Sequence, residues 1–384
     1  MLFGATAALF FSMTVAALVH QRWARRLPAL AALPATRRLD GSNTGQVRCS
    51  VVVAARNEEA RLETTVRHLL AQHGVAVDVI VVDDRSTDRT RDILRRLASE
   101  DARVQATHVE VLPEGWLGKC YACHVGASAA TAEWFLFTDA DCWLKPDVIA
   151  RAVRVADREA ADHITLTPGV AAETRGARAW HLALLTRLAS WISGVNRDRS
   201  GAHLGIGAFN LVRAPAYRDC GGYEALRLTI VDDVKLGLLL HRAGKRTRAF
   251  VGGDDAECHW GTTVPGMIRI MEKNYFAAVD FRLAPVLTIA FIGPLILGAA
   301  IIGPLTGTVA GMAAGLAPWS LTVPAAVFAR RLGWSLGSAA MTPLLYPVLL
   351  YAVLNSASVT LRQGGVRWRD TFYSLDMLRK GTVR

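Results

Sequence analysis

Cysteine is scarce in this chain, and the six cysteines that are present form no regular framework. Most of them lie inside segments that read as buried strands or helices, so we expect reduced thiols, which excludes the small disulfide-rich secreted class. The closest cluster, Cys120 and Cys123 followed by His124, matches the C-x-x-C-H pattern of covalent haem attachment. The same stretch reads as the start of an ordinary amphipathic helix, which is the interpretation we favour.

Nucleic-acid-binding motifs are also absent. The sequence has no zinc-finger spacing, no basic helix followed by heptads and no basic stretch interleaved with aromatic residues. The chain is nevertheless basic, with 44 Lys and Arg against 33 Asp and Glu and a formal net charge of +11. Because 52% of its residues are hydrophobic, this charge favours contact with anionic lipid headgroups. We therefore expect a membrane partner and no nucleic acid.

Charged residues are missing from four apolar stretches, each about long enough to span a bilayer. The first runs from Leu2 to Val19, and no basic stretch precedes it, which argues against a cleaved signal peptide. The basic residues that follow it place that end in the cytoplasm. The other stretches occupy about 283–304, 306–328 and 337–360.

These spans leave the membrane topology open. One span before the intervening region and three after it would put the C-terminal tail outside. The tail, residues 362–384, is rich in basic residues, which favours the inside. Either one stretch is re-entrant or interfacial, or the tail breaks the rule.

Predicted strands and helices alternate between the membrane stretches. Short continuous apolar runs, typical of strands buried on both faces, alternate with amphipathic helical patterns such as Asn57 to Ala71. This alternation predicts an α/β fold with a largely parallel sheet and helices on both faces. The predicted strands lie at 49–55, 77–82, 104–109, 134–138 and 164–167.

Acidic residues follow three of these strands at the point where each strand ends. They are Glu58, the pair Asp83 and Asp84, and the pair Asp139 and Asp141. In parallel sheets, ligands gather at the carboxyl ends of the strands. Close carboxylates repel one another, and a divalent cation such as Mg²⁺ or Mn²⁺ resolves that repulsion. The pattern predicts a metal at Asp139 and Asp141 that also grips a nucleotide diphosphate, although Asp83 and Asp84 also suit a turn and helix cap.

Seven short motifs stand in a fixed order: VVVAARNEE (51–59), VVDDRSTD (81–88), GWLGK (115–119), FTDAD (137–141), GIGAFN (205–210), GGY (221–223) and VDDVKL (231–236). Together they resemble glycosyltransferase family 2. The resemblance covers most of residues 48–245 and implies a GT-A fold, which is Rossmann-like, beside the transmembrane helices. It also implies a nucleotide-sugar donor, for which we expect a UDP-sugar because uridine is common in the family.

The resemblance assigns roles to individual residues. Asp139 and Asp141 would hold the divalent cation, and Asp233, with Asp232 before it, would be the catalytic base. Sugar transfer does need a carboxylate to take the acceptor's proton, although acids at a helix start are also favoured by the helix dipole. The donor would be bound by Ala55, Arg56, Glu58, Asp83, Asp84, Lys119 and Asp139, and the acceptor by Gly207, Phe209 and Asn210.

Processive members of the family carry a Q-x-x-R-W motif after the base, and residues 267–275 lack it in that form. This absence favours the transfer of a single sugar. The GWLGK motif and the arrangement of spans are similar to ceramide glucosyltransferase-like and hopanoid- or carotenoid-associated bacterial transferases, which implies a lipid acceptor. Two alternatives remain, a processive polysaccharide synthase and a non-enzymatic membrane scaffold or transporter.

We expect an integral protein of a bacterial inner or plasma membrane. Its catalytic domain lies between the membrane segments in the sequence and faces the cytoplasm. Its parts are an N-terminal transmembrane helix (1–20), a basic cytosolic linker (21–47), a GT-A catalytic domain (48–260), an amphipathic interfacial helix (261–282), about three transmembrane helices (283–361) and a basic tail (362–384).

Overall fold

The central sheet has eight strands, and every predicted strand takes part in it. The strands are β1 (Arg48–Ala55), β2 (Ala76–Asp84), β3 (Val104–Val109), β4 (Trp134–Asp139), β5 (Cys142–Leu144), β6 (His163–Val170), β7 (Asn210–Arg213) and β8 (Thr247–Cys258). The computed structural model describes residues 1–33 and 47–384, and there the strand order is β3-β2-β1-β4-β7-β6-β8-β5. The first four strands in that order are parallel, β7 is antiparallel to both neighbours, and β6 is parallel to β8. The predicted, mostly parallel α/β sheet is confirmed.

Helices cover both faces of the sheet because side chains alternate along each strand. The covering helices are α2 (Leu62–Leu70), α3 (Thr90–Glu100), α4 (Gly118–Ala129), α5 (Val148–Arg158), α7 (Ala214–Asp219), α8 (Gly222–Ala225) and α9 (Asp232–Arg242). In β1, Val51 and Val53 belong to a core that α2, α3 and α5 complete. Val52 belongs to a second core that α4, α7, α8 and α9 complete.

The helix after β1 starts later than the sequence pattern indicates. We expected it at Asn57, but α2 begins at Leu62. Asn57 has a φ of 55°, its side-chain oxygen accepts the backbone N–H of Thr87 at 2.8 Å, and its own N–H donates to the Ser86 hydroxyl at 2.9 Å. These bonds tie together the loops after β1 and β2, so the chain stays non-helical where Arg56 and Glu58 reach the site.

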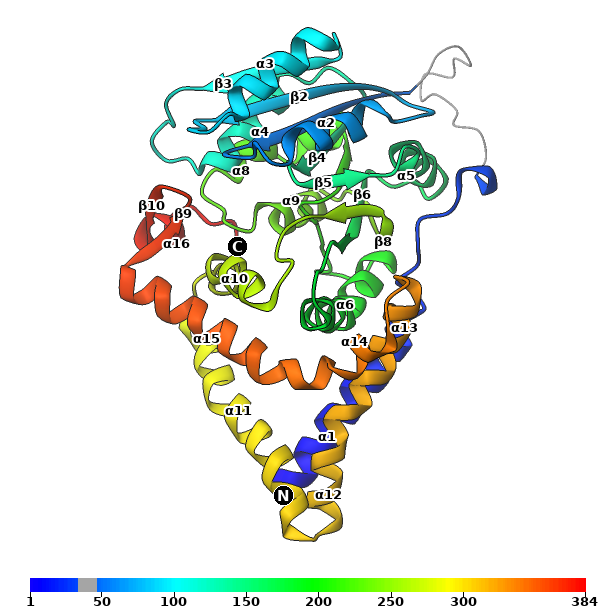
Figure 1. Cartoon of the computed structure of the whole chain (residues 1–384), viewed down its shortest axis with the longest axis vertical. Helices are drawn as coiled ribbons and strands as arrows, with labels where there is room; N and C mark the ends of the chain where they lie inside the picture. Colours follow the sequence, from blue (N-terminus) through cyan, green and yellow to red (C-terminus); the bar gives the residue numbers. More distant parts are fainter. Residues whose placement is uncertain (34–46) are drawn as a thin grey trace.

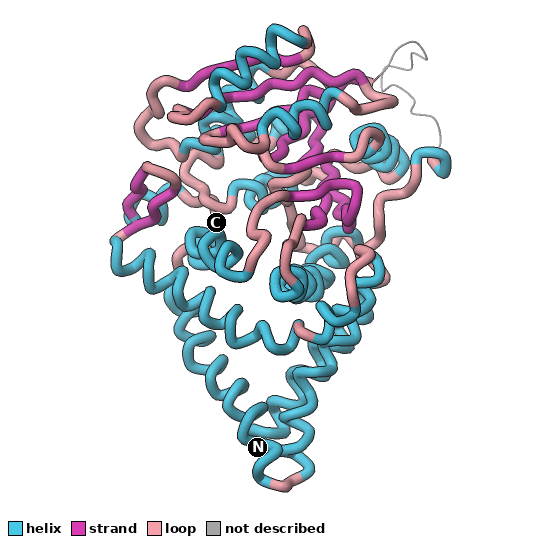
Figure 2. Tube along the Cα trace, in the orientation of Figure 1, coloured by secondary structure: helices cyan, strands magenta, loops and turns pink. Residues whose placement is uncertain are grey.

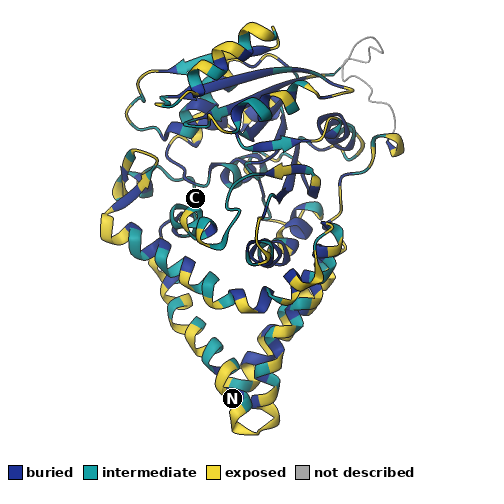
Figure 3. Ribbon diagram, in the orientation of Figure 1, coloured by how far each residue is buried: buried dark blue, intermediate teal, exposed yellow. Residues whose placement is uncertain are grey.

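Four helices in the described chain are long and apolar enough to cross a membrane. They are α1 (Leu2–Gln21), α11 (Leu283–Ile302) with its extension to Thr306, the run Val309–Arg331 that contains α12 (Val309–Leu316) and α13 (Thr322–Arg331), and the run Thr342–Gln363 that contains α15 (Tyr346–Gln363). Figure 2 shows the helical wedge that they form below the strands. Exposed residues cover the narrow end of the wedge (Figure 3), and they include Leu305 and Val309.

The last of these helices does not reach the narrow end. Figure 1 shows α1, α11 and α12 converging there, whereas α15 crosses beneath the sheet domain and ends beside β9 (Gly365–Trp368). The chain then forms β10 (Thr371–Ser374), antiparallel to β9, and the short helix α16 (Leu375–Gly381). The C-terminal segment thus lies on the sheet side, which favours the re-entrant or interfacial alternative for the last apolar stretch.

Two further helices lie between the sheet and the wedge (Figure 1). Helix α6 (Arg175–Asn196) packs against α1 and α13, and it shares with α13 the apolar cluster that includes Leu182, Leu185 and Phe328. Helix α10 (Val264–Ala278), within the predicted interfacial segment, packs along α15, and its Phe276 N–H donates to the Ser356 hydroxyl at 3.0 Å. These two helices form the floor of the site described below. Of the predicted linker, residues 34–46 lie outside the described part of the chain.

Candidate active site

A cavity of about 510 Å³ lies at the carboxyl ends of β1, β2 and β4. Ten of the thirteen residues that the sequence nominates line this cavity: Ala55, Arg56, Glu58, Asp84, Lys119, Asp139, Asp141, Gly207, Asp232 and Asp233. They come from the ends of three strands, from the starts of α4 and α9, and from the loop before β7. The fold therefore brings together segments that are as far apart in the sequence as residues 55 and 233.

The other three nominated residues do not line the cavity. Asp83 is fully buried, and its carboxylate binds the Arg91 guanidinium at 3.1 Å and His108 at 3.2 Å. Burial would raise the pKa of Asp83, but hydrogen bonds from Ser86, Arg91 and His108 lower it. Asp83 is thus a structural acid that anchors the end of β2, and its neighbour Asp84 faces the cavity.

Phe209 and Asn210 are buried below the cavity wall. The side-chain oxygen of Asn210 accepts the Ile206 N–H at 3.1 Å and lies 3.1 Å from His163 Nε2. Asn210 therefore fixes the loop that carries Gly207. The nominated acceptor role remains geometrically open only for Gly207.

Asp139 and Asp141 have the chemistry of a divalent-cation site. Lys119 Nζ lies 2.7 Å from Asp139, whereas Asp141 has no ion-pair partner within the described residues. Burial, with the nearby carboxylates of Asp139 and Glu58, raises the pKa of Asp141 to about 7. Hard oxygen ligands with excess negative charge suit Mg²⁺ or Mn²⁺, because the cation would relieve this repulsion.

Gly207 approaches Asp139 so closely that a side chain at this position would displace the Asp139 carboxylate. A Cβ atom at position 207 would lie 2.7 Å from Asp139 Oδ2. The backbone N–H of Gly207 donates to Asp233 Oδ2 at 2.8 Å. Gly207 therefore links the predicted metal site to the predicted base.

The base region contains a second pair of acids at the start of α9. Each oxygen of Asp233 accepts one backbone N–H at 2.8 Å, from Gly207 and from Val234. Asp232 accepts the Tyr223 hydroxyl at 3.0 Å and lies 3.7 Å from Lys119. Burial raises the pKa of Asp232 to about 6, although Lys119 opposes that shift.

Lys119 lies between the two acidic pairs. Burial favours its neutral amine, but the carboxylates of Asp139, Asp232 and Asp233 outweigh burial and raise the pKa of Lys119 well above its usual value. The side chain therefore stays cationic. A permanent positive charge beside Asp139 is suited to contact a phosphate group.

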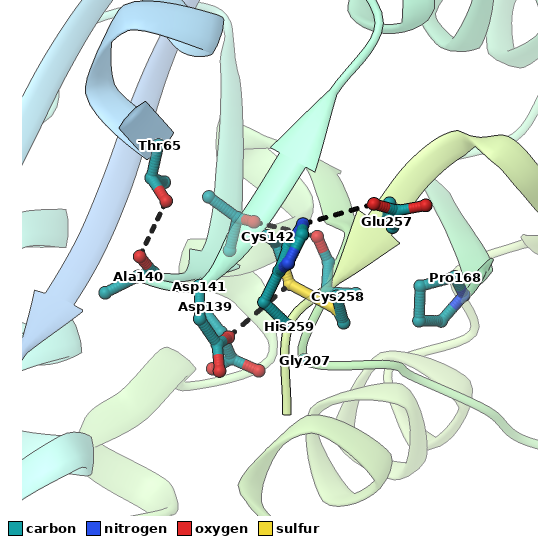
Figure 4. Close-up of a disulfide and its surroundings, with 12 residues drawn as sticks. Thr65, Asp139, Ala140, Asp141, Cys142, Pro168, Gly207, Glu257, Cys258 and His259 are labelled. Carbon is teal, nitrogen blue, oxygen red and sulfur yellow. Dashed lines mark hydrogen bonds and ion pairs between the residues drawn. A yellow bond between two sulfur atoms is a disulfide. The ribbon is translucent and has the colours of Figure 1, made fainter. Parts of the chain in front are cut away.

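A disulfide joins Cys142 to Cys258 next to Asp141 (Figure 4), so the expectation that all thiols are reduced is wrong for this pair. Residue 142 in β5 pairs with residue 258 in β8, and their Cα atoms are 4.4 Å apart. The two cysteines are 116 residues apart in the sequence, so only the strand register reveals the pairing. The disulfide fixes the strand that begins immediately after Asp141.

The disulfide predicts the number of free thiols. Protein purified without reductant, denatured and alkylated should carry four labels, on Cys49, Cys120, Cys123 and Cys220. After reduction, the label count should rise to six, and mass spectrometry of the unreduced digest should recover the Cys142 and Cys258 peptides linked. Six labels without reduction would contradict the pairing. Cys120 and Cys123, which suggested a haem attachment motif, are buried in α4 as free thiols.

The sequence interpretation missed the cavity residues that come from beyond the catalytic motifs. Helices α6 and α10 supply an apolar group that includes Leu184, Leu188 and Met271, and the C-terminal hairpin supplies Trp368, Arg369 and Tyr373. Lys273 of α10, considered only loosely from the sequence, also lines the cavity, and burial lowers its pKa to about 8. A usable signal was present, because the aromatic residues Trp368 and Tyr373 interrupt a tail that otherwise reads as merely basic.

Comparison with known proteins agrees with this architecture. The family model described as glycosyl transferase family 2 matches residues 50–221. A 4,4'-diaponeurosporenoate glycosyltransferase from Staphylococcus haemolyticus (strain JCSC1435) is 36% identical over 114 residues, which cover 30% of this chain and 29% of that protein. The enzyme of the same name from Staphylococcus aureus (strain bovine RF122 / ET3-1) is 36% identical over 104 residues, 26% of each protein. The match therefore spans less than a third of the length of these curated relatives.

A solved structure shares the fold over nearly the whole chain. A mannosyltransferase from Pyrobaculum calidifontis, in complex with GDP-Man and Mn²⁺, aligns with a TM-score of 0.54 over 93% of this chain and 98% of that chain. Its sequence identity is 19%, so the likeness concerns the fold alone. Residues 50–221 thus match the glycosyl transferase family 2 model, and the chain has the expected GT-A fold, in agreement with the family resemblance of its motifs.

Proposed function

We propose that this protein is an inverting, metal-dependent glycosyltransferase that moves one sugar from a nucleotide-diphosphate sugar, expected to be a UDP-sugar, to a membrane lipid. One observation supports this most strongly: a single cavity joins the acidic pair Asp139 and Asp141 to Asp233 and continues along the apolar side chains of α6 and α10. The first part suits a charged donor, and the second suits an apolar acceptor.

The donor end combines hydrogen-bonding and cationic groups around the acidic pair. Arg56, Glu58 and Asp84 lie at the ends of β1 and β2, where the nucleoside would bind, and Lys119 lies beside Asp139, where the diphosphate would bind. Asp139 and Asp141 would hold Mg²⁺ or Mn²⁺. When bound there, the cation neutralises the charge that develops on the departing diphosphate.

Asp233 would act as the general base. Its oxygens each accept only one backbone N–H, so each retains a lone pair for the acceptor's proton. In a single displacement, the acceptor oxygen forms a bond to the anomeric carbon as the bond from that carbon to the diphosphate breaks. The acceptor's proton passes to Asp233, and the configuration of the anomeric carbon inverts.

The acceptor end of the cavity lies nearest to the membrane helices. Leu184, Leu185 and Leu188 of α6 line it, and α6 packs on α1 and α13. Met271 of α10 lines it from the side of α15. A lipid could present its polar head to Asp233 while its apolar part stays against these helices. The matched relatives carry 4,4'-diaponeurosporenoate in their name, which supports a lipid acceptor.

The test is donor turnover by the purified full chain in lipid extract, with radiolabelled UDP- and GDP-sugars and either Mn²⁺ or EDTA. We expect label in the organic phase with Mn²⁺ and none with EDTA, and the active donor identifies the nucleotide. Label in a water-soluble polymer would instead indicate the processive synthase. No turnover and no nucleotide binding under any condition would leave the non-enzymatic scaffold.

A further inference from the structure

The C-terminal hairpin β9–β10 is part of the cavity wall. Trp368, Arg369 and Tyr373 line the cavity beside residues from the ends of β1 and β2. Val366 and Tyr373 belong to the same apolar core as α4 and α9, and so does Leu378 of α16. The segment after the last apolar helix is therefore integrated into the catalytic domain.

Three contacts fix the hairpin over the donor end. The Tyr373 hydroxyl accepts the backbone N–H of Gly118 at 3.2 Å, next to Lys119. Asp370 pairs with Arg56 at 3.2 Å. The ammonium group of Lys273 lies 4.1 Å from the centre of the Trp368 ring. The hairpin is thus held by α4, by the loop after β1 and by α10, and its turn, Arg369 and Asp370, contacts the loop after β1.

Arg369 is different from the other cations of the cavity. Its guanidinium donates to Glu58 at 2.6 Å, yet 46% of its side chain is exposed, so it can leave Glu58 without unpacking the core. Its φ of 53° is a left-handed conformation that Gly, Asn or Asp adopts more readily, so turn geometry alone does not explain an arginine here. Glu58 itself lines the same cavity as Asp139 and Asp141.

We propose that Arg369 is a donor-binding residue that exchanges its ion pair with Glu58 for the diphosphate of the nucleotide sugar. This inference rests on the proposed function. The charges of the cavity support this role, because six carboxylates line its wall and only four Lys and Arg side chains do. One of these four cations, Lys119, already contacts Asp139 and Asp232, so few cations remain to bind a diphosphate. A planar guanidinium can bind two phosphate oxygens at once, and Arg369 lines the same cavity as Lys119.

The test compares two arginines of the same hairpin. Arg367 is exposed and does not line the cavity, so Arg367→Ala removes the same charge without touching the donor site. We expect Arg369→Ala to weaken the binding of UDP or GDP, measured with Mn²⁺ by isothermal titration, about tenfold to a hundredfold. Arg369→Lys should fall between wild type and Arg369→Ala, and Arg367→Ala should match wild type.

Phosphate-free ligands separate a phosphate contact from a general disturbance. Uridine or guanosine should bind wild type and Arg369→Ala equally. The role of Arg369 would be overturned if Arg369→Ala lost as much affinity for the nucleoside as for the nucleoside diphosphate. It would also be overturned if Arg369→Ala and Arg367→Ala bound the diphosphate equally well. Either result would leave the proposed function intact. Failure of wild type to bind either diphosphate would overturn the proposed function itself, and this inference with it.

Discussion

Replacement of Asp139 by Asn is expected to lower sugar transfer by at least about a thousandfold, which corresponds to about 4 kcal/mol of lost transition-state stabilisation. The variant removes one of the two carboxylates that would hold the cation. It also removes the negative charge beside the Lys119 ammonium, which lies 2.7 Å away, so the cationic side chain would be held less firmly at the proposed diphosphate position. Turnover should fall at saturating donor, because the lost interaction acts mainly on the departing diphosphate.

The measurement has to separate loss of metal from loss of fold. Mn²⁺ affinity, followed by electron paramagnetic resonance, should fall together with turnover, while the melting temperature of the metal-free protein should not fall. Asp376→Asn is the matched control, because Asp376 is an exposed acid on α16 that pairs with Lys380 outside the cavity. Wild-type turnover in Asp139→Asn, or full activity of wild type in EDTA, would contradict a metal at this position.

The sequence was sufficient to predict the parts of the fold that depend on local patterns. The strand that begins at Trp134 is a continuous apolar run followed at once by Asp139, and such a run has few alternatives to a buried strand. Residues at the carboxyl ends of parallel strands must share one edge, so Glu58, Asp84 and Asp139 could be grouped before any coordinates were known. The carboxylates that can be grouped in this way, Glu58, Asp84, Asp139 and Asp141, do line one cavity, whereas Lys119, Gly207, Asp232 and Asp233 were nominated by the family resemblance.

The sequence could not predict features that depend on long-range register. The Cys142–Cys258 pairing arises from the antiparallel alignment of β5 with β8, and neither strand is apparent as a partner of the other from sequence. Asp83 and Asp84 are adjacent, and since side chains alternate along a strand, only one of them can face the cavity; the structure assigns that role to Asp84. The hairpin was missed because its packing partners lie more than 200 residues earlier, at Arg56, Glu58 and Gly118.

Replacement of Asp233 by Asn is expected to lower turnover about a hundredfold to ten-thousandfold, the range for loss of a general base. Donor affinity should change little, because the proposed role of Asp233 is to take a proton from the acceptor. Turnover at saturating donor, together with donor titration, separates these two quantities. The amide of Asn has only one oxygen, so it can keep one of the two 2.8 Å bonds that Asp233 accepts from Gly207 and Val234.

Asp233→Asn could also lower turnover in a second way, by losing the hydrogen bond that Asp233 accepts from the Gly207 N–H. Gly207 lies against Asp139, so a displaced loop should also weaken Mn²⁺ binding, whereas loss of a base should leave it unchanged. Asp232→Asn provides the second comparison, because Asp232 is bound to Tyr223 and lies near Lys119, so its loss should affect donor binding more than proton transfer. Unchanged turnover in Asp233→Asn, with a large loss in Asp232→Asn, would move the base to Asp232.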